Sequence, residues 1–164
     1  GSGKTDLICR VIKYFKTKKL LIATIKHTHH NISIDKKGKD SYSHREAGAS
    51  EVLVGGDNNW SLIHNGKENE KFDLNQLIKK FSKDTDILIV EGMKTAMIPK
   101  VEVYNSKLNK EIISSQDKDT IAIVYDQIDN KINNCKLPKF DFKNTIQISE
   151  FIINYFRNNE KKKL

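Results

Sequence analysis

The stretch GSGKTDLICRVIKYF, residues 1–15, joins a glycine-rich turn to an amphipathic helix and decides which fold to expect. Leu7, Ile8, Val11 and Phe15 recur at helical spacing directly after the turn. A glycine-rich turn that opens a helix lets backbone N–H groups approach an anion, and the positive end of the helix favours negative charge there. This segment therefore predicts a phosphate-binding loop.

The turn matches the end of the pattern G-x-x-x-x-G-K-[ST]. In that pattern Gly1, Ser2 and Gly3 would line the phosphates, Lys4 would neutralise the β- and γ-phosphates, and the Thr5 hydroxyl would bind Mg²⁺. The leading glycine and the strand before it would precede Gly1, so we expect the first strand and half of the loop to be missing from this chain. A bare GSGKT also arises by chance or from a cloning scar. Patterns further along the sequence are therefore needed to support a phosphate-binding loop.

A second signal is an apolar run that ends in a carboxylate. The run DILIV at 86–90 predicts a buried parallel strand, and Glu91 and Gly92 follow it directly. Ligands gather at the carboxyl ends of parallel strands, so we predict that Glu91 reaches Mg²⁺ directly or through a water and forms the catalytic pair with Lys4. The alternative is an ordinary surface carboxylate at a strand end.

The order of the elements predicts an α/β fold. Strands and helices alternate along most of the chain, which favours a P-loop NTPase-like layered fold with a mainly parallel sheet and an added β-hairpin. We expect one N-terminally incomplete domain over 1–164. The expected strands are 20–25, 52–54, 60–63, 86–90, 101–104, 121–125 and 145–148, and the last is expected to lead into a helix capped by Ser149.

Composition narrows the class of protein. The chain has 164 residues, 30% of them charged, and a net charge of +8, with lysines spread along its length. Unclustered lysines and 8% aromatic residues do not form the basic, aromatic stripe of a nucleic-acid-binding module, and no apolar run is long enough to span a membrane. The cysteines Cys9 and Cys135 match no disulfide or zinc spacing, which favours the cytoplasm.

Several longer stretches resemble the MobB family of molybdopterin-guanine dinucleotide biosynthesis adapters, which are small P-loop GTP-binding proteins. The most specific is ATIKHTHHNISIDKKGKDSYSHREAGASEVLV at 23–54. WSLIH, DILIVEGMK at 86–94 and IPKVEVY at 98–104 support it, and the likeness extends to about Phe156.

The resemblance implies a homodimer that binds GTP and Mg²⁺ and is at most a weak GTPase acting as an adapter. Its partners would be the molybdopterin guanylyltransferase, which joins GMP to molybdopterin, and molybdoenzyme maturation proteins. An autonomous ATP-dependent kinase or ligase of the same P-loop class is the alternative. Such an enzyme would need a catalytic base of its own, and the sequence shows no further paired constellation that would supply one.

The histidine-rich segment after residue 25 has two interpretations. His27, His29 and His30 contain good transition-metal ligands, although their spacing fits no zinc site. The resemblance implies instead a switch-like loop near the γ-phosphate, in which Lys26, Lys37 and Lys39 contact phosphate or pterin and Asp35 helps to hold Mg²⁺. His27 is assigned to cofactor binding with them. An exposed polar loop is the plain alternative.

Two aspartates complete the candidate site. Asp126 follows the strand IAIVY and would accept hydrogen bonds from a guanine base, although the full guanine signature NKxD is absent and a turn-forming surface aspartate is the alternative. Asp6 stands where the family usually has a second Thr, next to the phosphates. Its carboxylate would oppose an anion there unless Mg²⁺ or a lysine offsets it.

Overall fold

The computed structural model describes residues 2–28, 32, 34–66, 70 and 72–160. It divides into two compact units, one made of residues 1–27 and 82–164 and the other of residues 28–81. The expectation of a single domain stays a prediction, and each unit is described by itself below. Within the described part of the chain, no helix is long and apolar enough to cross a membrane.

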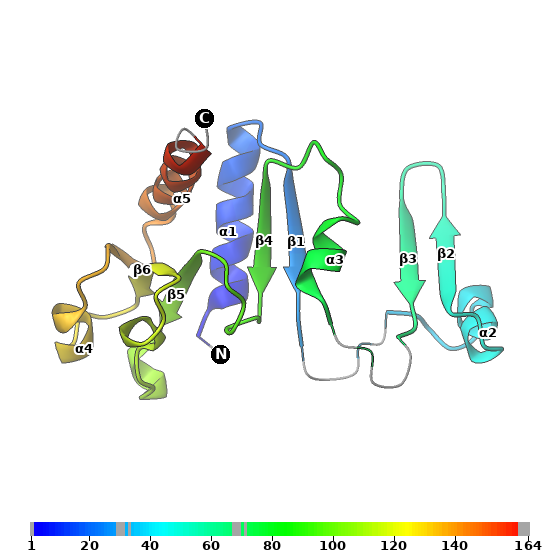
Figure 1. Cartoon of the computed structure of the whole chain (residues 1–164), viewed down its shortest axis with the longest axis horizontal. Coiled ribbons are helices and arrows are strands. Elements are labelled where there is room, and N and C mark those ends of the chain that lie inside the picture. The colour runs from blue at the N-terminus through cyan, green and yellow to red at the C-terminus, as the bar shows by residue number, and fades with distance from the viewer. Residues whose placement is uncertain (1, 29–31, 33, 67–69, 71, 161–164) are drawn as a thin grey trace. The chain divides into compact units, whose positions relative to one another are not determined.

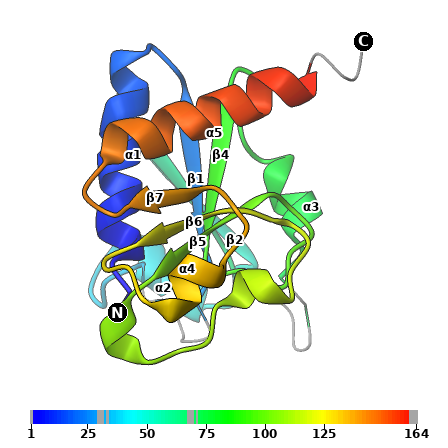
Figure 2. The ribbon, with the colours of Figure 1, turned by 90° about the vertical axis from the view of Figure 1, so that its left-hand side faces the viewer.

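Parallel strands and two long helices build the first unit (Figure 1). β1 (Ile22–Lys26) pairs in parallel with β4 (Ile87–Glu91). β5 (Lys100–Tyr104), β6 (Thr120–Tyr125) and β7 (Lys139–Asp141) form a second parallel sheet, and α5 (Thr145–Glu160) lies above β7 in Figure 2. Shorter elements are α4 (Asn130–Asn134) and two 3₁₀ turns, η1 (Ser106–Leu108) and η2 (Ile113–Ser115).

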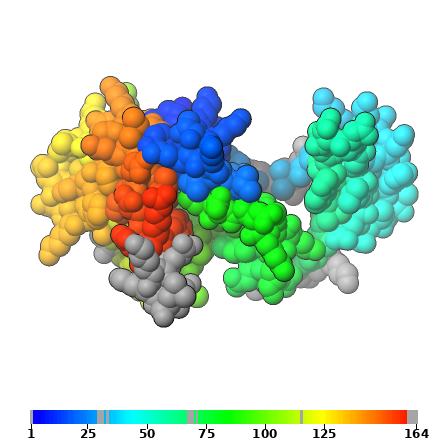
Figure 3. All heavy atoms as spheres, turned by 90° about the horizontal axis from the view of Figure 1, so that it is seen from above, coloured from blue at the N-terminus to red at the C-terminus, as the bar shows by residue number. Residues whose placement is uncertain are grey.

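Helix α1 (Lys4–Thr17) joins these parts through its apolar face. Leu7, Val11 and Phe15 are buried in one cluster with Val124 of β6 and Ile148 of α5. The spacing of four residues along the helix explains the burial, because such positions share one face. α1 and α5 pack against each other, and their atoms lie side by side in Figure 3. The predicted α/β architecture with parallel strands is confirmed.

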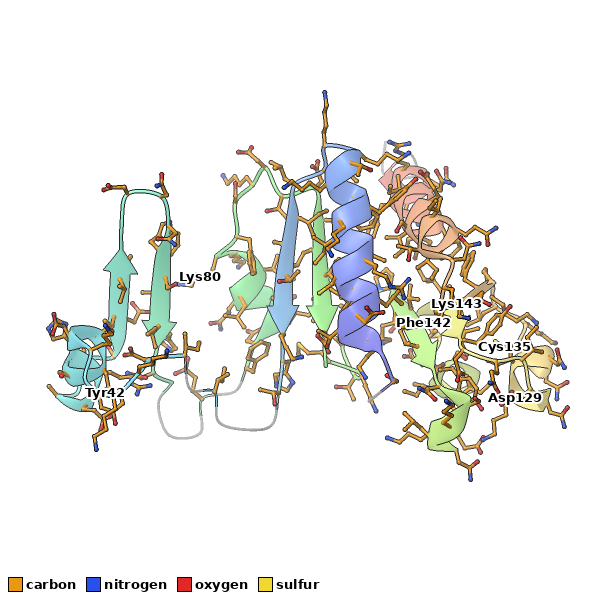
Figure 4. All side chains as sticks on the ribbon, turned by 180° about the vertical axis from the view of Figure 1, so that it is seen from behind. Tyr42, Lys80, Asp129, Cys135, Phe142 and Lys143 are labelled. Carbon is orange, nitrogen blue, oxygen red and sulfur yellow. The ribbon has the colours of Figure 1, made fainter. Side chains whose placement is uncertain are left out.

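The second unit contains the predicted hairpin. β2 (Glu51–Gly55) and β3 (Trp60–His64) are antiparallel, and the short helices α2 (Asp40–Glu46) and α3 (Leu74–Ile78) flank them in sequence. Within this unit Arg45 of α2 lies over the ring of Tyr42, which Figure 4 labels, at 5.1 Å from the ring centroid.

The predictions for the C-terminal region were wrong. The expected strand 145–148 is the first turn of α5, and β7 lies earlier in the chain. Thr145, Ile146 and Ile148 have the β-branched side chains typical of a strand, but burial of Ile148 and Ile153 along one helix face outweighs that preference. Ser149 is buried inside α5 rather than capping it.

Asn144, and not the predicted Ser149, caps the N-terminus of α5. Its side-chain oxygen accepts a hydrogen bond from the backbone N–H of Gln147 at 3.2 Å, three residues along, as a helix cap does. Asn144 therefore satisfies one of the free N–H groups in the first turn of α5.

An apolar groove lies between β4 and β5. Among the described residues β4 pairs with β1 and β5 pairs with β6, so the two strands do not pair with each other. The cavity between them has a volume of about 520 Å³ and extends to Ser2, Lys4 and Glu91. Its apolar lining includes Leu7, Val11, Ile89, Val103, Ile148 and Ile152. Two strands that do not pair with each other, with apolar side chains between them, form a slot for one extended apolar segment.

We predict that an apolar strand of about five residues, fused ahead of Gly1 with the leading phosphate-loop residues, fills this groove. Burying several apolar side chains and satisfying two strand edges should raise the melting temperature by about 5 °C or more. The measurement is thermal unfolding followed by circular dichroism. An extension of the same length made of Gly and Ser is the control, and equal melting temperatures for the two extensions would contradict the prediction.

Candidate functional site

The predicted phosphate loop turns into α1 at Gly3. Gly3 has a φ of 86°, in the left-handed region that favours glycine, and it precedes the first helical residue. Lys4 Nζ donates a hydrogen bond to Ser2 Oγ at 2.9 Å, so the ammonium bends back over the turn. The first backbone N–H groups of a helix have no partner within the helix, so this end of α1 has donors for an anion.

Glu91, Thr5 and Lys26 meet beside this turn. Thr5 Oγ1 donates to Glu91 Oε1 at 3.1 Å, and Lys26 Nζ lies 3.3 Å from both carboxylate oxygens of Glu91. The Glu91 side chain is only 15% exposed, so this carboxylate is fixed largely within the protein. The structure thus brings together Ser2, Gly3, Lys4, Thr5, Lys26 and Glu91, all of which the sequence had proposed for the site.

The parallel register explains why Lys26 and Glu91 face each other. Lys26 pairs with Glu91 at the last step of the β1–β4 ladder, at the carboxyl ends of both strands. The backbone N–H of His27 then donates to the Glu91 carbonyl at 2.8 Å. Gly92 follows with a φ of 103°, and a side chain there would collide with the His27 carbonyl oxygen. A glycine is therefore required directly after Glu91.

These donors fit a magnesium ion. Mg²⁺ prefers oxygen ligands, usually one or two from the protein with the rest from water and phosphate. A hydroxyl and a carboxylate stand 3.1 Å apart here, and the carboxylate already faces a cation, the Lys26 ammonium. Among the described residues no cluster of three His, Cys, Asp or Glu side chains could hold a metal by itself, so an ion at this place would rely on ligands beyond the protein.

Other predicted site residues belong to the second unit, follow β1 directly or fall outside the described residues. Asp35 and Lys37 belong to the second unit, where Asp35 accepts hydrogen bonds from the backbone N–H of Lys36 and from Ser41 Oγ. His27 directly follows Lys26 at the end of β1. The positions of Gly1, His29 and His30 are outside the described residues.

Asp126 binds the 3₁₀ turn η1 through Ser106. Its two carboxylate oxygens accept hydrogen bonds from the backbone N–H and the hydroxyl of Ser106, at 2.8 and 3.0 Å. Burial raises the pKa of the Asp126 carboxyl, but the hydrogen bonds from Ser106 outweigh burial and hold that pKa below its usual value. The carboxylate is therefore ionised and anchors η1, and its role as a base reader stays a prediction.

Two further residues, Arg10 and Phe142, contact the loop without having been predicted from the sequence. The Phe142 ring packs against Gly3 so closely that a Cβ at Gly3 would lie 2.8 Å from Phe142 Cζ. Arg10 lies over the same ring at 4.7 Å from its centroid. Phe142 is far from the loop in sequence, and no local pattern indicates its contact. Arg10 follows Asp6 at helical i,i+4 spacing, a signal that was available.

Comparison with known proteins gives the family. The family model for molybdopterin guanine dinucleotide synthesis protein B, MobB, matches residues 1–126. The chain belongs to the MobB family. The molybdopterin-guanine dinucleotide biosynthesis adapter protein of Haemophilus influenzae is 30% identical over 162 residues, covering 96% of this chain and 85% of that protein. The protein of the same name from Escherichia coli is 35% identical over 105 residues, covering 63% of this chain and 60% of that protein.

A solved structure of the family shares the fold. The crystal structure of Bacillus subtilis MobB superposes with a TM-score of 0.72 at 27% identity, covering 93% of this chain and 90% of that one. The P-loop NTPase-like fold expected from the sequence agrees with this likeness.

We predict that Gly92→Ala destabilises the first unit by about 2 kcal/mol or more. The substitution combines a left-handed backbone with a collision against the His27 carbonyl. Gly48→Ala is the control, because Gly48 has a φ of 105° with open space around it, and should cost only about 1 kcal/mol. Urea unfolding of both variants measures the difference, and equal losses would contradict the role assigned to the close approach.

Proposed function

We propose that this chain is a GTP-binding adapter in the synthesis of molybdopterin guanine dinucleotide. The observation that supports nucleotide binding best is the meeting of Lys4, Thr5 and Glu91 at the N-terminus of α1. A triphosphate with its metal requires positive charge, metal ligands and backbone N–H donors. The lysine supplies the charge, the hydroxyl and the carboxylate supply metal ligands, and the helix N-terminus supplies the N–H groups. Membership of the MobB family supports guanine as the base and adapter as the role.

In this proposal each residue has a distinct role. Ser2 and Gly3 border the phosphates, Lys4 turns from Ser2 Oγ to the β- and γ-phosphates, and Thr5 with Glu91 holds Mg²⁺. The bound ion would neutralise the phosphate oxygens and make a slow GTPase reaction possible. A bound Mg²⁺ would compete with the Lys26 ammonium for the carboxylate oxygens of Glu91, because both are cations close to the same group.

The adapter role requires partners rather than a second catalytic site. We propose that the chain works in the cytoplasm beside the guanylyltransferase that attaches GMP to molybdopterin, and beside proteins that mature molybdoenzymes. The names of the Haemophilus influenzae and Escherichia coli relatives support this place in the synthesis.

We further propose that the protein is a homodimer and that the hairpin forms the contact between its copies. Leu53 pairs with Leu62 and Gly55 pairs with Trp60, so these residues share one face of the hairpin. Leu53 is 63% exposed and Trp60 67%, whereas Val52 on the opposite face is buried. A two-stranded hairpin with an exposed apolar face needs a partner surface, and an identical hairpin related by a two-fold axis supplies one.

A charged pair borders that apolar face. Glu51 pairs with His64 across the strands, and His64 Nδ1 lies 3.0 Å from Glu51 Oε1. Hydrogen bonds with Glu51 and then with Glu70 raise the pKa of the His64 imidazole above its usual value. The apolar centre with a polar border resembles the core and rim of protein interfaces.

Nucleotide binding is tested by calorimetric titration of the protein carrying a complete phosphate loop with GTP and with ATP, each with Mg²⁺. We expect GTP to bind more tightly than ATP and only in the presence of the ion. Lys4→Ala should weaken binding by about 10- to 100-fold, the value of one charged hydrogen bond. Lys13→Ala, an exposed lysine on the same helix, is the matched control and should bind like the wild type.

A preference for ATP would instead favour an autonomous kinase or ligase of the same class. Absence of binding by either nucleotide would reject the proposed function.

The dimer is tested with Leu53→Glu. A carboxylate in an apolar contact loses its hydration, so dissociation of the dimer should become at least about 100-fold more favourable. Light scattering coupled to size-exclusion chromatography measures the mass over a range of concentrations. Ile146→Glu, which changes an exposed apolar side chain on α5, should leave the mass unchanged. A wild-type protein that is monomeric at high concentration would contradict the proposal.

A further inference from the structure

Arg10 uses its whole guanidinium group beside the phosphate loop. Its Nε donates to Asp6 Oδ2 at 3.0 Å, its Nη2 donates to the Phe142 carbonyl at 2.9 Å, and its Nη1 donates to Thr145 Oγ1. The planar group also lies over the Phe142 ring. The Arg10 side chain is 27% exposed, so much of its charge is shielded from water and directed to these partners.

Asp6 is the partner that needs explanation. It lies in the first turn of α1, one residue after Thr5, and its side chain is 64% exposed. A carboxylate favours a helix N-terminus in an empty protein, but it repels phosphate groups that bind at the same terminus. Lys4 and Lys26 face Ser2 and Glu91, so neither is the cation that pairs with Asp6 in this structure. Arg10 is that cation.

The contacts of Arg10 also fix where its charge lies. Phe142 packs against Gly3 and lies under the Arg10 guanidinium, and its backbone N–H donates to the Tyr125 carbonyl at 2.8 Å. Thr145 starts α5. The guanidinium is therefore anchored to two segments besides its own helix, and it holds the Asp6 carboxylate along the helix surface at the i,i+4 spacing.

We propose that Arg10 cancels the charge of Asp6 at the edge of the phosphate site and thereby sets the affinity for nucleotide. This inference rests on the proposed function, because it concerns the same phosphate groups. Arg10 acts through Asp6 and is a positioning residue. The competing explanation is that Arg10 only ties α1 to α5 and Phe142, in which case the charge of Asp6 would not matter for binding.

A double-mutant cycle separates the two explanations. Wild type, Asp6→Asn, Arg10→Met and the double variant, all with a complete phosphate loop, are titrated with GTP and Mg²⁺. Arg10→Met should bind at least about tenfold more weakly, because an uncompensated carboxylate faces the phosphates. Asp6→Asn should bind about threefold more tightly, and the double variant should return to within about threefold of wild type. Lys13→Met, which removes another cation from α1, should have no effect.

Two further readouts identify charge as the cause. The deficit of Arg10→Met should shrink as NaCl is raised from about 50 to 500 mM, because salt screens exposed charges. The same deficit should appear with inorganic triphosphate and Mg²⁺, which contain no base. If Arg10→Met does not fold, the tighter binding of Asp6→Asn and a smaller loss in Arg10→Lys, which keeps the charge, carry the test.

A deficit that Asp6→Asn does not rescue, that is independent of salt, or that is absent with inorganic triphosphate would overturn the inference and leave the proposed function standing. A wild-type protein that binds neither GTP nor triphosphate would overturn both.

Discussion

The parallel pairing of β1 with β4 is the constraint on which the site depends. Its register sets Lys26 opposite Glu91 at the last step of the ladder. A shift of one strand by one residue would turn its side chain to the other face of the sheet, away from its partner, because side chains alternate along a strand. Ile22 and the buried Ile87 pair on one face and pack in the same apolar cluster, so they fix this register. Apolar packing thus decides where the ionic groups of the site meet.

The two described carboxylates of the site are each paired with a cation, and Lys4 adds one unpaired positive charge. Glu91 faces Lys26, and Asp6 faces Arg10, while Lys4 bends back to Ser2. Each carboxylate near the start of α1 therefore has a cation, and Lys4 keeps its charge for an incoming anion. This arrangement lets two acidic groups stand beside a phosphate site without making it repulsive, because neutral pairs project a weak field.

The sequence predicted the phosphate loop, the acidic strand end and the hairpin because each is a local pattern. The run DILIV before Glu91 and the turn GGDN at 55–58 need only neighbours in the chain to be recognised. The error at Thr145 arose because β-branched residues favour strands locally, while packing with α1 decides the outcome. The contact of Phe142 with Gly3 was not predictable, since the two residues are far apart in the sequence and meet only in the folded first unit.

The insertion of the whole second unit between β1 and β4 has a consequence for the rate of folding. About 60 residues separate the two strands, so their pairing closes a long loop at an entropic cost that grows with the logarithm of its length. The hairpin of β2 and β3 closes over only four residues and can form within microseconds. Once the hairpin has formed, the flexible part of the chain between β1 and β4 is shorter. We therefore expect the hairpin to fold first and the parallel sheet that carries the site to be the slow step.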